Sequence, residues 1–172
     1  WSSDVCSSDL SGRSRAAIAA ARAAGIEVVV ATARSPRTLG SVVADAGIGG
    51  LAICANGAIL YDLDAERIVR HTSLDAAIAH DLVRGLRARF PGIAFCWEHE
   101  LRFGSEPAYE ALRQPHWWPR PETAYAPCDP LAWDRPMTKL LARLPGGDLE
   151  EILAAATELA GARATTTRSE EH

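Results

Sequence analysis

The stretch Ile26–Arg34, Ile-Glu-Val-Val-Val-Ala-Thr-Ala-Arg, decides the fold of this chain. Residues 26–31 form a nearly continuous β-branched run, which predicts a strand covered on both faces, as in a parallel sheet. Thr32 and Arg34 follow at its C-terminal end. Ligands of open parallel sheets bind at that edge, so these two residues are the first candidates for a functional site.

The segments on either side of this strand are predicted to be helices. Ser11 is a suitable N-cap for an alanine-rich helix over residues 13–24, whose thin apolar stripe suits packing on a sheet, and Gly25 ends it. Ser35-Pro36 opens a second helix that is expected to run to about Ala46, because proline favours the first position of a helix. A strand between two helices is typical of an α/β fold.

The Asn56-Gly57 pair predicts a hairpin. It separates two short apolar runs, residues 51–55 and 59–61, and Asn-Gly readily adopts the positive φ angles of a tight turn. Asn56 is therefore either a turn residue only or a side chain that also faces a ligand at the end of the sheet.

The second half of the chain is expected to form a smaller α+β domain with its helices on one face. We place the boundary between residues 66 and 67, with residues 11–66 in the first domain and 67–172 in the second. Residues 102–121, rich in Pro, His and Trp, are expected to be irregular. The remaining elements are strands over 67–71, 93–97, 137–144 and 163–167, and helices over 74–90 and 148–159.

Composition excludes several classes of protein. The 172 residues are 48% hydrophobic and 23% charged, as in an ordinary globular protein, and the net charge of −4 provides no basic surface for nucleic acid. No apolar run approaches the roughly 18 residues of a membrane span. Four cysteines without a CxxC pair indicate neither a zinc site nor a disulfide framework, so a reducing cytoplasm is expected.

Residues 1–10, Trp-Ser-Ser-Asp-Val-Cys-Ser-Ser-Asp-Leu, stand apart from the rest. They have neither apolar periodicity nor the layout of a signal peptide. Their back-translation matches a common sequencing adapter read in frame. We interpret them as an artefact, and Asp4 and Asp9 are therefore not taken as catalytic carboxylates.

Three segments together carry a resemblance to a known family. They are Ser11–Ile18, Ala24–Arg34 and Cys54–Ile59, and their order and spacing resemble the early part of a Cof-type phosphatase of the haloacid dehalogenase superfamily. The resemblance covers the chain to about Tyr61. Beyond it, only the topology is similar to the inserted cap domain of that group. Ala33 departs from the family, which usually has glycine there, and we expect the extra methyl group to be tolerated.

The resemblance implies a partial Rossmann-like core followed by a cap domain. It implies a magnesium-dependent phosphohydrolase that acts on small phosphomonoesters, such as sugar phosphates, through an aspartyl-phosphate intermediate. Thr32 matches the hydroxyl that hydrogen-bonds the phosphoryl group, and Asn56 and Gly57 match a motif that faces the substrate. Arg34 would add positive charge there. The nucleophile, the acid/base aspartate and the Mg²⁺ ligands are expected outside this chain, so the chain alone is expected to be inactive, marginally stable and prone to aggregation.

Other interpretations remain open at this point. Thr32 could cap the helix after Ser35, and Arg34 could be a surface charge. The chain could be a non-catalytic α/β module that binds a small ligand or dimerises. A nucleotide-binding enzyme is disfavoured, because no GxGxxG or GxxxxGK[ST] motif is present.

Polar and aromatic residues of the second half have similar alternatives. Glu98, His99 and Glu100 resemble a metal cluster, but alternate strand residues point to opposite faces, which favours a solvated strand end. His99 and the His116-Trp117-Trp118 run either select a substrate or fill the core of a small domain, and the core is favoured.

Overall fold

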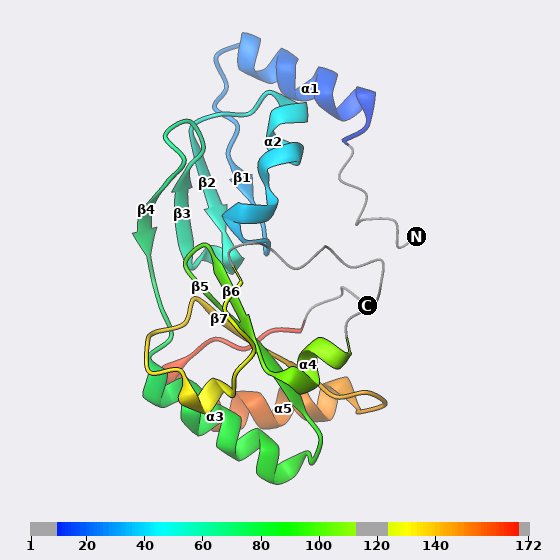
Figure 1. Ribbon diagram of the computed structural model, residues 1–172. Coiled ribbons are helices and arrows are strands. Elements are labelled where there is room, and N and C mark those ends of the chain that lie inside the picture. Colours follow the sequence, from blue (N-terminus) through cyan, green and yellow to red (C-terminus); the bar gives the residue numbers. More distant parts are fainter. Residues whose placement is uncertain (1–9, 113–123, 169–172) are drawn as a thin grey trace. The chain divides into compact units, whose positions relative to one another are not determined.

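The computed structural model describes residues 10–112 and 124–168. The chain divides into two compact units between Thr72 and Ser73 (Figure 1). The first unit contains the predicted Ile26–Arg34 stretch, and the second contains most of the predicted α+β domain.

The first unit is built on a four-stranded sheet with the order β1-β2-β3-β4. β1 runs parallel to β2, and the β2–β3 and β3–β4 pairs are antiparallel. The α/β fold class predicted from the sequence is therefore confirmed. The elements are α1 (Gly12–Ala23), β1 (Val30–Ala31), a 3-10 turn (Pro36–Thr38), α2 (Gly40–Ala46), β2 (Leu51–Cys54), a 3-10 turn (Ala55–Gly57), β3 (Ile59–Asp62) and β4 (Arg67–His71).

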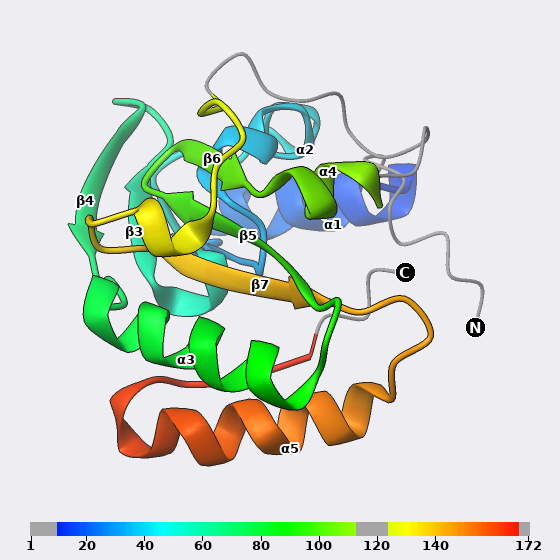
Figure 2. The same ribbon diagram turned by 60° about the horizontal axis from the view of Figure 1, so that its bottom comes forward.

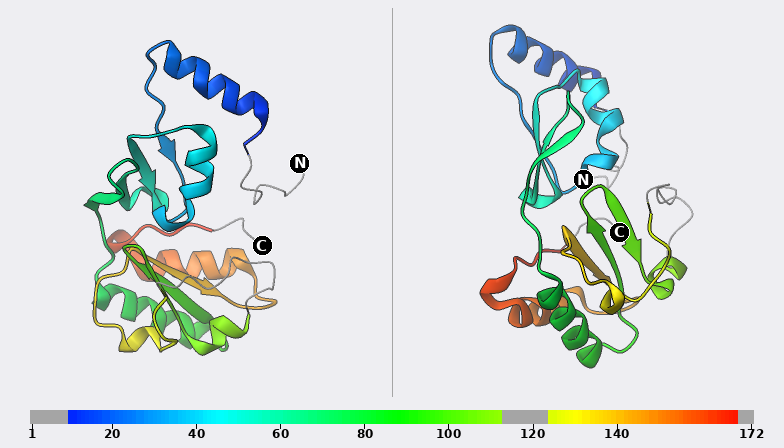
Figure 3. Two further views of the ribbon diagram at one scale, coloured as in Figure 1. Left: turned by 45° about the horizontal axis from the view of Figure 1, so that its top comes forward. Right: turned by 60° about the vertical axis from the view of Figure 1, so that its left-hand side comes forward.

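Helix α2 and the turn before it cover one face of this sheet (Figure 3). Leu39 and Val43 pack against Ala52 and Ile59, which are completely buried. The start of α1 and the end of α2 follow the sequence signals, but the prediction of a helix that opens at Ser35-Pro36 was wrong: a 3-10 turn over Pro36–Thr38 comes first, and α2 begins at Gly40 without a side-chain cap. The Ser11 hydroxyl accepts a hydrogen bond from the Ser14 amide at 3.0 Å, and Gly47 ends α2 with a left-handed φ of 60°.

The strand predicted over residues 26–31 is much shorter in the structure. Only Val30 and Ala31 pair with β2, and Ile26 and Val29 are 58% and 46% exposed. β1 lies at the edge of the described sheet, and no residue of helix α1 is buried. A β-branched run forms a long strand only where neighbours cover it, so the prediction of a doubly covered strand was wrong for this chain.

The predicted hairpin is present, and its turn is larger than two residues. Ala55, Asn56 and Gly57 have consecutive φ angles of 51°, 56° and 93° between β2 and β3. β4 continues this sheet, because Ile68 pairs with Tyr61. The structure thus divides the chain after Thr72 rather than after residue 66.

The second unit has a three-stranded antiparallel sheet with the order β6-β5-β7. Helices α3 and α5 pack together on one face of it, as the sequence predicted (Figure 2). Phe95 of β5 is completely buried between the sheet and Val83 of α3. The elements are α3 (Ala76–Arg89), β5 (Ala94–His99), β6 (Arg102–Ser105), α4 (Pro107–Ala111), a 3-10 turn (Pro130–Ala132), β7 (Lys139–Arg143), α5 (Leu149–Ala160) and a 3-10 turn (Gly161–Arg163).

Three predictions for this unit were wrong. Residues 102–112 are not irregular, because β6 pairs with β5 and α4 follows it. Residues 163–167 form no strand: the 3-10 turn Gly161–Arg163 ends at the first of them, and a bend and irregular chain follow. Glu98 is only 7% exposed rather than solvated, because β6 and β7 flank it on both sides and place Phe103 and Lys139 opposite it.

Candidate functional site

The structure brings Thr32, Arg34 and Asn56 together at the C-terminal ends of β1 and β2. The Thr32 amide donates to the carbonyl of Ile53 at 2.9 Å and continues the parallel ladder. In the next two hydrogen bonds the donor amides belong to the turn after β2, and the acceptor carbonyls belong to the loop after β1. The Ala55 amide donates to the Arg34 carbonyl at 2.9 Å, and the Asn56 amide donates to the Thr32 carbonyl at 3.2 Å. These bonds join the loop after β1 to the turn after β2.

The Thr32 side chain stabilises its own loop. Its Oγ1 accepts a hydrogen bond from the Arg34 amide at 3.1 Å, which is a local threonine turn. Thr32 does not cap the helical turn over Pro36–Thr38, whose N-cap is Ser35. A hydroxyl group has one donor and two acceptor positions, so this bond uses an acceptor position of Thr32 and not its proton.

Sequence reasoning missed Ser35 as a polar group of this loop. Ser35 is 4% exposed, and its Oγ makes no hydrogen bond to any described residue. Buried hydroxyl groups usually have a partner, so this oxygen marks a polar position next to Arg34. The Ser-Pro pair pointed only to the start of a helix, and only the fold shows that the side chain is buried.

The thiol nearest the candidate site is in its neutral form. Burial raises the pKa of Cys54 to about 11, because the thiolate would lose its hydration. Burial also raises the pKa of Tyr61, with the charge of Glu66 as the second cause. Nucleophilic chemistry by a Cys54 thiolate is therefore not favoured at neutral pH.

The described residues do not fit a magnesium site. Within residues 10–112 and 124–168, no three His, Cys, Asp or Glu side chains gather where they could hold a metal ion. Mg²⁺ is bound through carboxylate and other oxygen ligands. The region around Thr32 thus offers hydroxyl, amide and guanidinium groups, which suit an anion rather than a cation.

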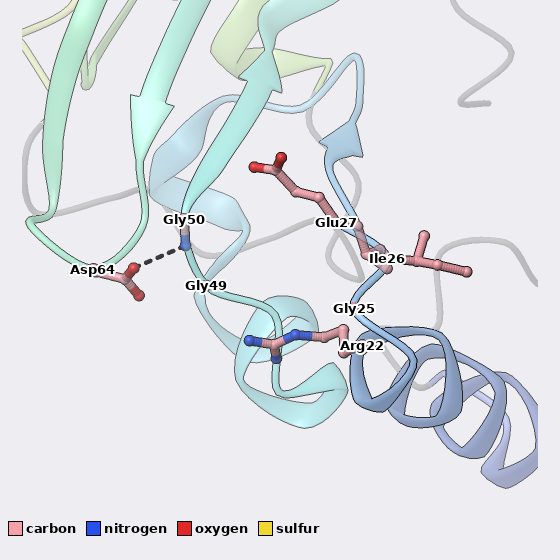
Figure 4. A pocket seen from close by; sticks show the side chains of 8 residues that line it. Arg22, Gly25, Ile26, Glu27, Gly49, Gly50 and Asp64 are labelled. Atoms are coloured by element: carbon pink, nitrogen blue, oxygen red, sulfur yellow. Dashed lines mark hydrogen bonds between the residues drawn. The ribbon is translucent and has the colours of Figure 1, made fainter.

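A separate open hollow of about 390 Å³ lies at the opposite end of the same strands (Figure 4). Ile26 and Glu27 line it before β1, and Gly49 and Gly50 line it before β2. The Asp64 carboxylate accepts a hydrogen bond from the Gly50 amide at 2.9 Å beside it. None of the predicted site residues lines this hollow.

The second unit contains a cluster of aromatic rings around Trp133. The Tyr125 and His99 rings lie 4.6 and 5.5 Å from it, centroid to centroid, and the Arg102 guanidinium lies 3.8 Å from the Tyr125 ring. A His99 ring nitrogen bonds the Pro136 carbonyl at 2.8 Å, so this histidine is held in the domain's packing. His116, Trp117 and Trp118 lie outside the described residues.

None of the helices within residues 10–112 and 124–168 is both long and apolar enough to cross a bilayer.

The family model for haloacid dehalogenase-like hydrolases matches residues 7–172. The chain belongs to this family. The resemblance that rested on the three N-terminal segments is thereby confirmed, and the matching family is described as haloacid dehalogenase-like hydrolases. No curated protein matches the chain.

Solved structures share the fold of this haloacid dehalogenase-like chain. A haloacid dehalogenase-like hydrolase from Bacteroides thetaiotaomicron is 16% identical with a TM-score of 0.66, over 94% of this chain and 62% of its own. A Thermotoga maritima protein is 17% identical with a TM-score of 0.58, over 88% and 56%. The phosphatase BT1666 from B. thetaiotaomicron is 20% identical with a TM-score of 0.50, over 61% and 37%. The chain thus spans between about a third and two thirds of these proteins.

Proposed function

We propose that this chain is part of a magnesium-dependent phosphohydrolase that acts on small phosphomonoesters of the sugar-phosphate kind. One observation carries the proposal: hydrogen bonds join Thr32, Arg34 and Asn56 at the carboxyl edge of β1 and β2. Membership of a hydrolase family supports it, and BT1666, a structural relative, is described as a phosphatase.

In this proposal the residues of the chain bind the phosphoryl group. The Thr32 hydroxyl donates to one phosphoryl oxygen, and its own oxygen is already held by the Arg34 amide. The Asn56 side chain and the Gly57 backbone face the rest of the substrate, and Arg34 adds positive charge. Donors held in place before the substrate arrives stabilise charge on phosphoryl oxygens without reorganisation.

The nucleophile, the acid/base group and the metal ligands belong to other parts of the polypeptide in this proposal. The described residues lack a carboxylate cluster for Mg²⁺, so the chain alone is expected to bind phosphate weakly and to hydrolyse nothing. The second unit then corresponds to a cap domain. We place the protein in the cytoplasm, with a small phosphorylated metabolite as its partner.

Phosphate titration of the 172-residue chain tests the binding part. The amide signals of Thr32, Arg34, Asn56 and Gly57 should shift together with inorganic phosphate in two-dimensional NMR spectra. Thr32→Val should abolish the shifts. Thr38→Val is the matched control, because the Thr38 hydroxyl donates to the Ser35 carbonyl in the same loop at 2.9 Å. Equal loss in both variants, or no shifts in the wild type, would contradict the proposal.

Sequencing the native locus across both ends of the chain tests the catalytic part. An Asp-x-Asp-Gly-Thr segment upstream, with a lysine and a Gly-Asp-x-x-x-Asp segment downstream, supports the hydrolase. Their absence would favour a non-catalytic binding module.

A further inference from the structure

The turn after β2 contains a residue in an unfavourable conformation. Ala55 has a φ of 51°, in the left-handed region that asparagine and glycine adopt far more readily than alanine. Asn56 and Gly57, which follow with φ angles of 56° and 93°, suit their conformations. The strain of this turn is therefore concentrated at Ala55.

Three contacts hold Ala55 in place. Its methyl group belongs to the core of the first unit, and the residue is 4% exposed. Its amide donates to the Arg34 carbonyl at 2.9 Å, and its carbonyl accepts from the Ala58 amide at 3.1 Å. Strained residues persist where their surroundings over-determine them, and they gather at functional sites.

Asn56, which follows Ala55, is exposed and lies beside Thr32. The Asn56 amide nitrogen is 3.2 Å from the Thr32 carbonyl, so the backbones of these two residues touch directly. Because the backbone of Ala55 is held in one conformation, the direction in which the Asn56 side chain leaves the backbone is held as well. A glycine in its place would adopt the same φ without strain, but it would also adopt many others.

We propose that Ala55 is a positioning residue, which holds the Asn56 side chain at a set place beside the Thr32 hydroxyl before an anion binds. This inference rests on the proposed function, in which both side chains contact the substrate. Holding the binding groups in the bound arrangement lowers the entropy that a ligand must overcome.

The experiment compares Ala55→Gly with Ala52→Gly in the full 172-residue chain. Ala52 is 0% exposed and belongs to the same core cluster, but its φ is not positive. Both variants lose one buried methyl group and gain one glycine. Two quantities are measured: the ¹⁵N order parameters of Asn56 and Gly57, and the affinity for inorganic phosphate from the NMR titration.

In Ala55→Gly, the order parameter of Asn56 should fall from about 0.85 toward 0.6. Phosphate affinity should fall about two- to fivefold. Ala52→Gly should unfold at lower denaturant concentration than Ala55→Gly, because it relieves no strain, yet leave both site readouts unchanged. Ala52→Gly would then lose more stability than Ala55→Gly, while only Ala55→Gly would lose phosphate affinity. If Ala55 had only a structural role, the variant with the larger loss of stability would also have the larger loss of affinity.

Unchanged Asn56 order in Ala55→Gly, or an equal loss of order in Ala52→Gly, would overturn the role of Ala55. If Asn56 order falls while phosphate affinity stays the same, positioning for the anion is likewise refuted. A wild-type chain without phosphate shifts would contradict the proposed function, and the Asn56 order parameters would still decide whether Ala55 fixes the turn.

Discussion

Gly104 of β6 and Trp97 of β5 pack closely together, which leads to a prediction for Gly104→Ala. Gly104 of β6 lies directly opposite Trp97 of β5. A methyl group on Gly104 would lie 2.6 Å from both Cζ2 and Nε1 of the Trp97 ring. Non-bonded heavy atoms prefer separations of about 3.5–4 Å, so one partner has to move by about 1 Å.

Neither partner has room for that movement. Trp97 is 0% exposed, packs against Ala79 and Met137, and has the Trp133 ring 5.9 Å away. Gly104 itself is buried, and its φ is not in the left-handed region. Overpacking a core costs about 1–3 kcal/mol, and we expect Gly104→Ala to lose about 3 kcal/mol of unfolding free energy.

Urea unfolding followed by far-ultraviolet circular dichroism measures this loss, since that signal comes mainly from the backbone of the helices and strands. Trp97→Leu removes the ring atoms that would clash and should cost about 2–3 kcal/mol by itself. In that background, Gly104→Ala should cost close to nothing. The double-mutant cycle should therefore give a coupling of about 2–3 kcal/mol. A loss below about 0.5 kcal/mol for Gly104→Ala, or the same loss in both backgrounds, would refute the clash.

Three further predictions follow from other contacts. Arg87→Met should destabilise the second unit by about 3 kcal/mol in urea unfolding, because it leaves the buried Glu106 carboxylate without its 2.6 Å ion pair. Adding Glu106→Gln to this variant should recover part of the lost stability. No recovery would show that the unpaired carboxylate is not the cause. Alkylation of Cys54, followed by mass spectrometry, should reach half its maximal rate near pH 11 rather than pH 9. The raised pKa also predicts that the contribution of Cys54 to stability is complete below pH 9 and declines as the pH rises toward 11. Fast labelling of Cys54 at pH 8 would disprove the raised pKa. Ile53→Lys should reduce self-association in light scattering, since Ile53 and Val69 are 41% and 45% exposed; equal association of variant and wild type would count against these side chains.

The helices and turns could be predicted because their signals are local. Asp148 begins α5 by accepting hydrogen bonds from the Glu150 and Glu151 amides, as its residue type suggests. Asn56-Gly57 forms its turn for the same kind of reason, since the preference for positive φ belongs to the two residues themselves.

The extent to which each strand is buried could not be predicted, because it depends on which strands and helices pack against it. The Ile26–Ala31 run has the composition of a central strand, yet most of it lies outside the described sheet. Glu98 has the composition of a surface residue, yet its position between two strands buries it. In both cases the residues of the segment do not say which other segments lie beside it.

The candidate site was predicted in part for the same reasons. Thr32, Arg34 and Asn56 follow strand-like runs, so their meeting at one sheet edge could be expected from topology. Ser35 and Ala55 were not identified, because a buried hydroxyl group without a described partner and a strained alanine become visible only in three dimensions.

The pairing of β1 with β2 has a consequence for the order of folding. The β2, β3 and β4 strands are consecutive antiparallel neighbours, and such local contacts form early. β1 joins them through a parallel pair, in which Val30 meets Ala52 only after the helical segment between them has closed a loop. We therefore expect Thr32 to reach Asn56 only after the β2–β3 hairpin has formed. During synthesis, the chain would carry a finished hairpin while the sheet edge with the candidate site was still incomplete.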